Sequence, residues 1–155
     1  MKAVAVIGPG TCDEPLAAQA REVGRLLAEQ GVALVCGGHG GVMEAAARGA
    51  HEAGGTTIGI LPGTDACEAN RFIQIPIVTG MGEARNVIII RSAQAVIAIG
   101  GEFGTLSEIA FALKLGVPVI GLNTWKLARE NEPVSIGVEA QTPAAAVAAA
   151  LEKIR

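Results

Sequence analysis

Six short, continuous apolar runs constrain the fold of this 155-residue chain more than any other feature. The runs cover residues 3–7, 32–36, 56–61, 75–78, 95–99 and 117–122. Runs that are apolar throughout, rather than alternating with polar residues, are typical of strands covered on both faces in a parallel sheet. The sequence therefore predicts a parallel sheet at the centre of the protein.

Helix-length segments lie between most of these runs. Helices are predicted over residues 15–30, 41–53, 105–115 and 143–154, the first with Pro15 in its first turn and Gly31 at its C-terminal cap. Residues 83–92 are rich in β-branched side chains, but the next run begins at residue 95, too soon for a parallel crossover, so we expect a buried helix there. This alternation predicts an α/β fold with a doubly wound parallel sheet in a three-layer sandwich.

Charge and composition argue against several classes of partner. The formal net charge is −3, with no run of five or more like charges, so we expect neither nucleic acid nor a membrane as a partner. With one Trp, three Phe and no Tyr, a base-stacking platform is not expected either. No segment approaches the roughly 18 uninterrupted apolar residues of a membrane span.

The cysteines and histidines are few and scattered. Cys12, Cys36 and Cys67 are odd in number and lack C-x-x-C spacing, and there are only two histidines. This pattern predicts neither a disulfide framework nor a metal site made by protein ligands. Reduced thiols and a cytoplasmic location are the expectation.

Two glycine-containing loops follow the first two predicted strands, where ligands bind in open α/β sheets. Residues 8–11, Gly-Pro-Gly-Thr, form a turn that can present backbone N–H groups to an anion, although such a turn needs glycines in any case. Residues 37–41 contain four glycines in five positions, which favours close approach of a ligand such as a phosphate. His39 in this loop either contacts a phosphate or is a solvated loop residue.

Two polar motifs occur later in the chain. Arg85 offers a planar fork of donors suited to phosphate, or else it pairs with Glu83, Glu108 or a helix C-terminus. Thr105 and Glu108 fit the S/T-x-x-E capping box, with Thr105 as the N-cap of a helix. That explanation leaves out Gly100, Gly101 and Gly104. If Glu108 instead turns into the cleft, it can act as a general acid or base or hold ribose hydroxyls.

Three motifs, in this order, resemble the molybdenum cofactor carrier protein family. They are GGHGGVME at residues 37–44, GMGEARN at 80–86 and GEFGTLSE at 101–108. That family belongs with the Lonely Guy and lysine-decarboxylase-like proteins, whose domain is a Rossmann-like sandwich. The resemblance implies that residues 1–155 form a single Rossmann-like domain that binds, protects and carries molybdenum cofactor, a small anionic phosphorylated pterin, without catalysis.

An enzyme is the alternative implied by the same resemblance. Lonely Guy enzymes are nucleoside 5′-monophosphate phosphoribohydrolases with the hallmark P-G-G-x-G-T-x-x-E and an arginine on a preceding helix. By position, Arg85 and Glu108 match that arginine and glutamate and would be the catalytic residues. Gly100 replaces the hallmark's proline and Glu102 its second glycine, which departs from the enzyme pattern. A nucleotide-sensing module without catalysis is a third hypothesis.

The carrier hypothesis defines a set of ligand-binding residues and partners. The candidates are Gly10, Thr11, Gly37, Gly38, His39, Gly40, Gly41, Val42, Met43, Arg85, Asn86, Gly100, Gly101, Gly104, Thr105 and Glu108. Molybdoenzymes are implied as recipients of the cofactor. We also expect a homo-oligomer, because residues 87–90 and 144–151 would leave apolar surface to cover, and the resemblance implies dimers or tetramers.

Overall fold

A seven-stranded parallel sheet lies at the centre of the computed structural model, which describes residues 1–154. Its spatial order is β4-β3-β2-β1-β5-β6-β9, and each neighbouring pair is parallel. The strands are β1 (Ala3–Ile7), β2 (Ala33–Cys36), β3 (Thr57–Leu61), β4 (Ile75–Val78), β5 (Ala95–Ile99), β6 (Val119–Leu122) and β9 (Val138–Ala140). The predicted Rossmann-like α/β fold is therefore confirmed.

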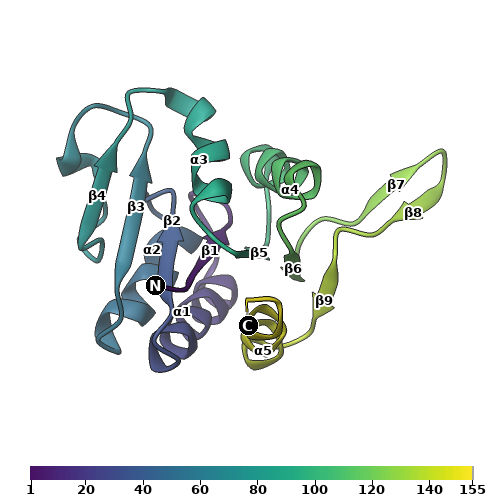
Figure 1. The fold of residues 1–155 in the computed structure, drawn as a ribbon, viewed down its shortest axis with the longest axis horizontal. Helices are drawn as coiled ribbons and strands as arrows, with labels where there is room; N and C mark the ends of the chain where they lie inside the picture. The colour runs from purple at the N-terminus through teal and green to yellow at the C-terminus, as the bar shows by residue number, and fades with distance from the viewer. Residues whose placement is uncertain (155) are drawn as a thin grey trace.

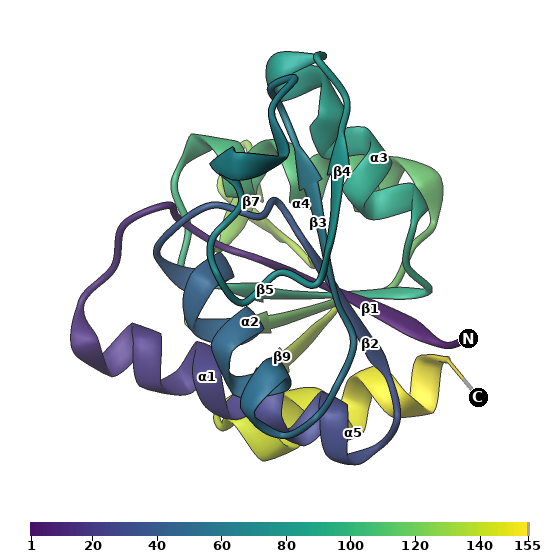
Figure 2. The same ribbon diagram turned by 90° about the vertical axis from the view of Figure 1, so that its left-hand side faces the viewer.

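Helices cover both faces of the sheet and complete the three layers (Figures 1 and 2). On one face lie α1 (Glu14–Glu29), α2 (Val42–Glu52) and α5 (Pro143–Lys153); on the other lie α3 (Asn86–Arg91) and α4 (Phe103–Leu115). Alternate side chains of a strand point to opposite faces of the sheet, so Val4 and Val6 pack in the core on the first face and Ala5 and Ile7 in the core on the second. None of the helices within residues 1–154 is long and apolar enough to cross a membrane.

The six predicted strands and the five predicted helices are all present. The segment over residues 83–92 is helical, as expected: a 3₁₀ turn, η2 (Gly82–Arg85), leads directly into α3. A second 3₁₀ turn, η1 (Ala66–Glu68), lies in the loop before β4. The sequence did not predict β9 or the hairpin of β7 (Leu127–Arg129) and β8 (Glu132–Val134), which projects from the body (Figure 1). These strands have three residues each, too few for a recognisable apolar run.

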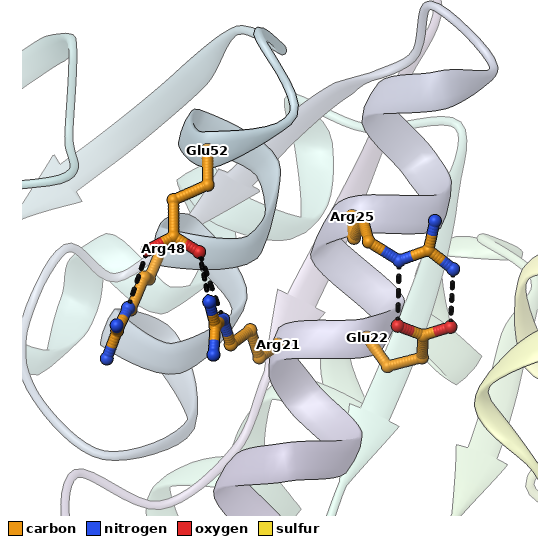
Figure 3. A network of polar contacts seen from close by, with 5 residues as sticks. All are labelled: Arg21, Glu22, Arg25, Arg48 and Glu52. Atoms are coloured by element: carbon orange, nitrogen blue, oxygen red, sulfur yellow. Dashed lines mark hydrogen bonds and ion pairs between the residues drawn. The ribbon is translucent and has the colours of Figure 1, made fainter.

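Helices α1 and α2 cross in direct backbone contact. A Cβ atom added to Gly24 would lie 1.9 Å from the carbonyl oxygen of Ala46, and one added to Gly49 would lie 1.9 Å from that of Arg21. Arg21 also pairs with Glu52 across the two helices, beside the Arg25–Glu22 and Arg48–Glu52 pairs (Figure 3). Exposed ion pairs of this kind are each worth less than about 1 kcal/mol. The two glycines therefore determine how closely the helices approach.

The apolar segments expected to drive oligomerisation are largely covered within the chain. Ile89 and Ile90 of α3 are fully buried, and Val147 of α5 is 4% exposed. The expectation that residues 87–90 and 144–151 leave apolar surface holds only in part, because the remaining side chains of both segments are half-buried or exposed, among them Val87, Ile88 and Ala148. Larger exposed apolar side chains lie on the edge strand β4, where Ile75 and Ile77 are 45% and 43% exposed.

Candidate functional site

The loops with candidate residues meet at the carboxyl ends of the central strands. Strand β1 pairs with β2 on one side and β5 on the other, which makes this the topological switch point of the sheet. A Cβ atom on Gly8, after β1, would lie 2.5 Å from the Val42 side chain and 2.6 Å from the Ile99 carbonyl oxygen. A Cβ atom on Gly37 would lie 2.9 Å from Nη2 of Arg85. The fold thus brings together segments that are far apart in the sequence.

The glycines of the loop after β2 are required by the protein's own packing. Gly37 lies under the Arg85 guanidinium, and Gly38, with a φ of +78°, leaves room for the Leu61 side chain. Gly41 has a φ of +61°, and a Cβ there would lie 2.3 Å from the Pro9 carbonyl oxygen. Close approach of the protein's own groups therefore accounts for these three glycines, whereas the sequence predicted close approach of a ligand. The glycines alone do not identify a ligand.

The other candidates of the first two loops differ in their exposure. Gly10 and Thr11 are exposed at the tip of the loop after β1, and Gly40 beside them is half-buried. Val42 is fully buried in the core, and the sulfur of Met43 lies against Gly37. Gly10, Thr11 and Gly40, and in part the half-buried Met43, therefore offer surface to a ligand, whereas the side chain of Val42 serves packing.

Arg85, at the end of η2, is the charged group at the centre of the site. Its Nη1 donates to Oδ1 of Asn86 at 2.6 Å, and its Nη2 lies 3.5 Å from the Gly37 carbonyl oxygen. Its Nε is buried without a hydrogen-bond partner. None of the four ion pairs found within residues 1–154 includes Arg85. Burial lowers the pKa of Arg85, while the charge of Glu108 raises it. The guanidinium therefore keeps donor capacity for an anion.

A chain of hydrogen bonds joins Arg85 to the first turn of α4. Asn86, which is 7% exposed, accepts from Arg85 and donates through Nδ2 to Oγ of Ser107 at 3.1 Å. Ser107 in turn donates to the carbonyl oxygen of Gly104 at 2.7 Å. These bonds hold the guanidinium and the start of α4 in one arrangement. We call Arg85 together with residues 103–105 the Arg85–α4 site.

The predicted capping box is wrong. The N-cap of α4 is Glu102, whose side chain makes no capping hydrogen bond, and the helix begins at Phe103. Thr105 lies within the helix, whereas an N-cap residue needs non-helical backbone angles. Thr105 is 2% exposed and its Oγ1 has no hydrogen-bond partner. The first-turn N–H groups of a helix have no intrahelical partners, so this uncapped terminus can donate to an anion.

Glu108 lies one turn further along α4 and is 7% exposed. Burial raises the pKa of its carboxyl from 4.5 to about 8, although the positive charge of Arg85 opposes the change. The carboxyl is therefore mostly protonated at neutral pH. A neutral Glu108 leaves the charge of Arg85 uncompensated, which favours binding of an anion.

His39 lies in the loop after β2, next to the glycines of the candidate site. The Nε2 of His39 is buried without a partner, and the Asn70 side chain holds this loop by donating to the carbonyl oxygens of Gly38 and His39. Within residues 1–154, no group of three His, Cys, Asp or Glu side chains is arranged to hold a metal ion.

Sequence reasoning missed the loop after β6. Thr124 donates through Oγ1 to the carbonyl oxygen of Gly100, and Trp125 donates through Nε1 to that of Glu102 at 3.2 Å. This loop follows the carboxyl end of a predicted strand, which is the signal that could have found it.

The profile of the SLOG cluster4 family matches residues 1–151 of this chain. The chain belongs to the SLOG cluster4 family. An uncharacterized relative from Archaeoglobus fulgidus is 52% identical over 120 residues, which are 77% of this chain and 78% of the relative.

Two solved structures resemble this SLOG cluster4 protein over almost their whole length. The molybdenum cofactor binding protein of the phototrophic bacterium Rippkaea orientalis is 35% identical, with a TM-score of 0.89 over 99% of this chain and 98% of that chain. The molybdenum cofactor carrier protein of Chlamydomonas reinhardtii is 38% identical, with a TM-score of 0.85 over 98% of this chain and 97% of that chain. The resemblance to the carrier proteins is thus present in both sequence and fold.

Proposed function

We propose that this protein binds, protects and carries molybdenum cofactor. The observation that carries the proposal is the full-length match, at 35–38% identity, with proteins described as binding or carrying that cofactor. The chemistry of the Arg85–α4 site supports it. Three buried polar atoms without partners, Nε of Arg85, Oγ1 of Thr105 and Nε2 of His39, belong to candidate residues. A cationic group and free donors suit a phosphorylated ligand.

The anionic end of the ligand would bind between Arg85 and the start of α4. Arg85 supplies charge-assisted hydrogen bonds, and the first-turn N–H groups with the Thr105 hydroxyl complete the donor set. Gly10 and Thr11, exposed on the loop after β1, would add contacts to the ligand. Molybdenum would arrive as cargo on the dithiolene sulfurs of the pterin, so the protein itself needs no metal ligands.

Anaerobic equilibrium binding of purified molybdenum cofactor tests this proposal. We expect saturable binding and transfer of the bound cofactor to a cofactor-free molybdoenzyme. Arg85→Gln should weaken binding by roughly 10- to 100-fold, since it removes a charge-assisted contact. Arg91→Gln, at an exposed position of α3, is the matched control and should leave affinity unchanged. Equal affinity of wild type and Arg85→Gln would contradict the assignment of the site.

A phosphoribohydrolase is the second candidate, and Glu108 favours it. A buried carboxyl with a pKa of about 8 beside an arginine can serve as a general acid at neutral pH. Release of free base from AMP or cytokinin monophosphates, abolished in Glu108→Gln, would favour this activity over carriage. Binding of the cofactor without base release favours the carrier.

We also propose that the protein is a cytoplasmic homo-oligomer. Cys12, Cys36 and Cys67 are all free within residues 1–154, which suits a reducing compartment. Strand β4 exposes Ile75 and Ile77 on the sheet face that carries only two helices, the short six-residue α3 and the longer α4. A second copy would bury this face. Ile77→Asp should therefore shift the molar mass measured by sedimentation toward that of the monomer, and an unchanged mass would contradict this interface.

A further inference from the structure

Two aromatic side chains are paired beside the Arg85–α4 site. Phe103, the first residue of α4, is 81% exposed, an unusual position for a large apolar side chain. Its ring stacks on Trp125, with ring centroids 6.1 Å apart and planes inclined by 29°. The chain has only four aromatic residues, three Phe and one Trp, so half of them form this pair. We call Phe103 and Trp125 the aromatic pair.

Several contacts hold Trp125 in place. Its Nε1 donates to the carbonyl oxygen of Glu102 at 3.2 Å. A Cβ atom on Gly101 would lie 2.6 Å from the same nitrogen, so only glycine leaves room for the indole. The neighbouring Thr124 donates to the carbonyl oxygen of Gly100. The loop after β6 is therefore joined to the loop after β5 by hydrogen bonds, one of them from the indole of Trp125.

The aromatic pair adjoins the start of α4, because Phe103 is the first residue of that helix. A cleft of about 260 Å³ runs beside it, lined by Gly100, Gly101, Asn123, Thr124 and Trp125. Phe103 and the buried, unpartnered hydroxyl of Thr105 belong to the same first helical turn. A ligand whose anionic end lies at this turn would therefore place its adjoining part near the aromatic rings.

We propose that Phe103 and Trp125 form the subsite for the flat heterocycle of the phosphorylated ligand, which stacks on the exposed ring of Phe103. This inference rests on the proposed anion site and adds the residues that recognise the other end of the ligand. Nitrogen-rich bicyclic rings stack on aromatic side chains because both have π-faces, and a pterin and a purine share this chemistry.

One aromatic pair accommodates a single heterocycle. Single-stranded nucleic acids require successive stacking side chains along a positively charged groove. This chain has a net charge of −3; of its two other aromatic residues, Phe72 lies in the loop before β4 and Phe111 lies about two turns further along α4. The subsite is thus consistent with the composition argument against nucleic acid and with a small heterocyclic ligand.

Fluorescence titration tests the proposal directly, because Trp125 is the single tryptophan of the chain. The probes are a pterin monophosphate, AMP and ribose 5-phosphate, each added to the full chain. We expect the pterin monophosphate to quench Trp125 emission with saturation. Ribose 5-phosphate, which has no heterocycle, should compete for the anion site without quenching.

Phe103→Ala identifies the stacking contribution. It should weaken binding of the heterocyclic probe by roughly 10- to 100-fold and leave the affinity for ribose 5-phosphate unchanged. Phe111→Ala, on the same helix and 36% exposed, is the matched control and should change neither affinity. Circular dichroism of both variants checks that α4 is intact.

The outcomes separate this inference from the proposed function. Equal affinities of Phe103→Ala and Phe111→Ala for the heterocyclic probes would overturn the subsite, even if phosphate binding persists. Binding of AMP alone, dependent on Phe103, would support the subsite and identify a purine in place of a pterin, which contradicts the carrier. Binding of the pterin alone, dependent on Phe103, supports both. Failure of all three probes to bind would overturn both.

Discussion

Replacement of Glu108 by glutamine should change how the stability of the protein depends on pH. Glu108 is 7% exposed, and burial raises the pKa of its carboxyl from 4.5 to about 8. Because the folded state holds the proton more tightly than the unfolded state, the contribution of Glu108 to stability is greatest below pH 4.5. It is lost as the pH rises toward 8.

The magnitude follows from the two pKa values. Each pH unit between them changes the free energy of unfolding by about 1.4 kcal/mol, so the full interval amounts to about 5 kcal/mol. Glutamine has nearly the same shape and no titratable proton. Relative to Glu108→Gln, the wild type should therefore lose about 4 kcal/mol of stability between pH 5 and pH 8.

Urea unfolding of both proteins at each pH from 5 to 8 measures this difference. Other titrating groups are common to the two chains and cancel in the comparison. Glu102→Gln, which makes the same substitution at an exposed position near the start of the same helix, is the matched control. Parallel stability curves for the wild type and Glu108→Gln would refute the claim that a buried, neutral carboxyl faces Arg85.

Two further substitutions test the packing and the site. Gly49→Ala should lower the free energy of unfolding by about 1–3 kcal/mol, because the new Cβ would lie 1.9 Å from the Arg21 carbonyl oxygen. Gly10→Ala is the control: a Cβ there would have nothing within 4 Å, so the free energy of unfolding should change by less than about 0.5 kcal/mol. Equal effects in urea unfolding would mean that α1 and α2 do not touch. Thr105→Val should raise the thermal midpoint, since a buried hydroxyl without a partner costs about 1–3 kcal/mol, and should weaken ligand binding. A lowered midpoint would show that the hydroxyl has a partner.

Local sequence patterns predicted most of the regular structure for identifiable reasons. Continuous apolar runs such as residues 95–99 became central strands because both faces of a parallel sheet are covered. The helix over residues 83–92 followed from the length of a parallel crossover. The capping box failed because S/T-x-x-E also occurs within a first turn, and the helix began two residues earlier than Thr105. Strand β9, with three residues, was too short to form a recognisable apolar run in the sequence.

The sequence by itself determined the order of the first six strands and the five helices, the parallel sheet and the loops that carry the candidate residues, because apolar periodicity and glycine placement act over a few neighbouring positions. Only the tertiary structure decided what those residues meet. It set Arg85 over Gly37, buried Glu108 beside that guanidinium and stacked Trp125 on Phe103. These contacts join residues 22 to 48 positions apart, and they depend on how the crossovers fold the chain back onto one edge of the sheet.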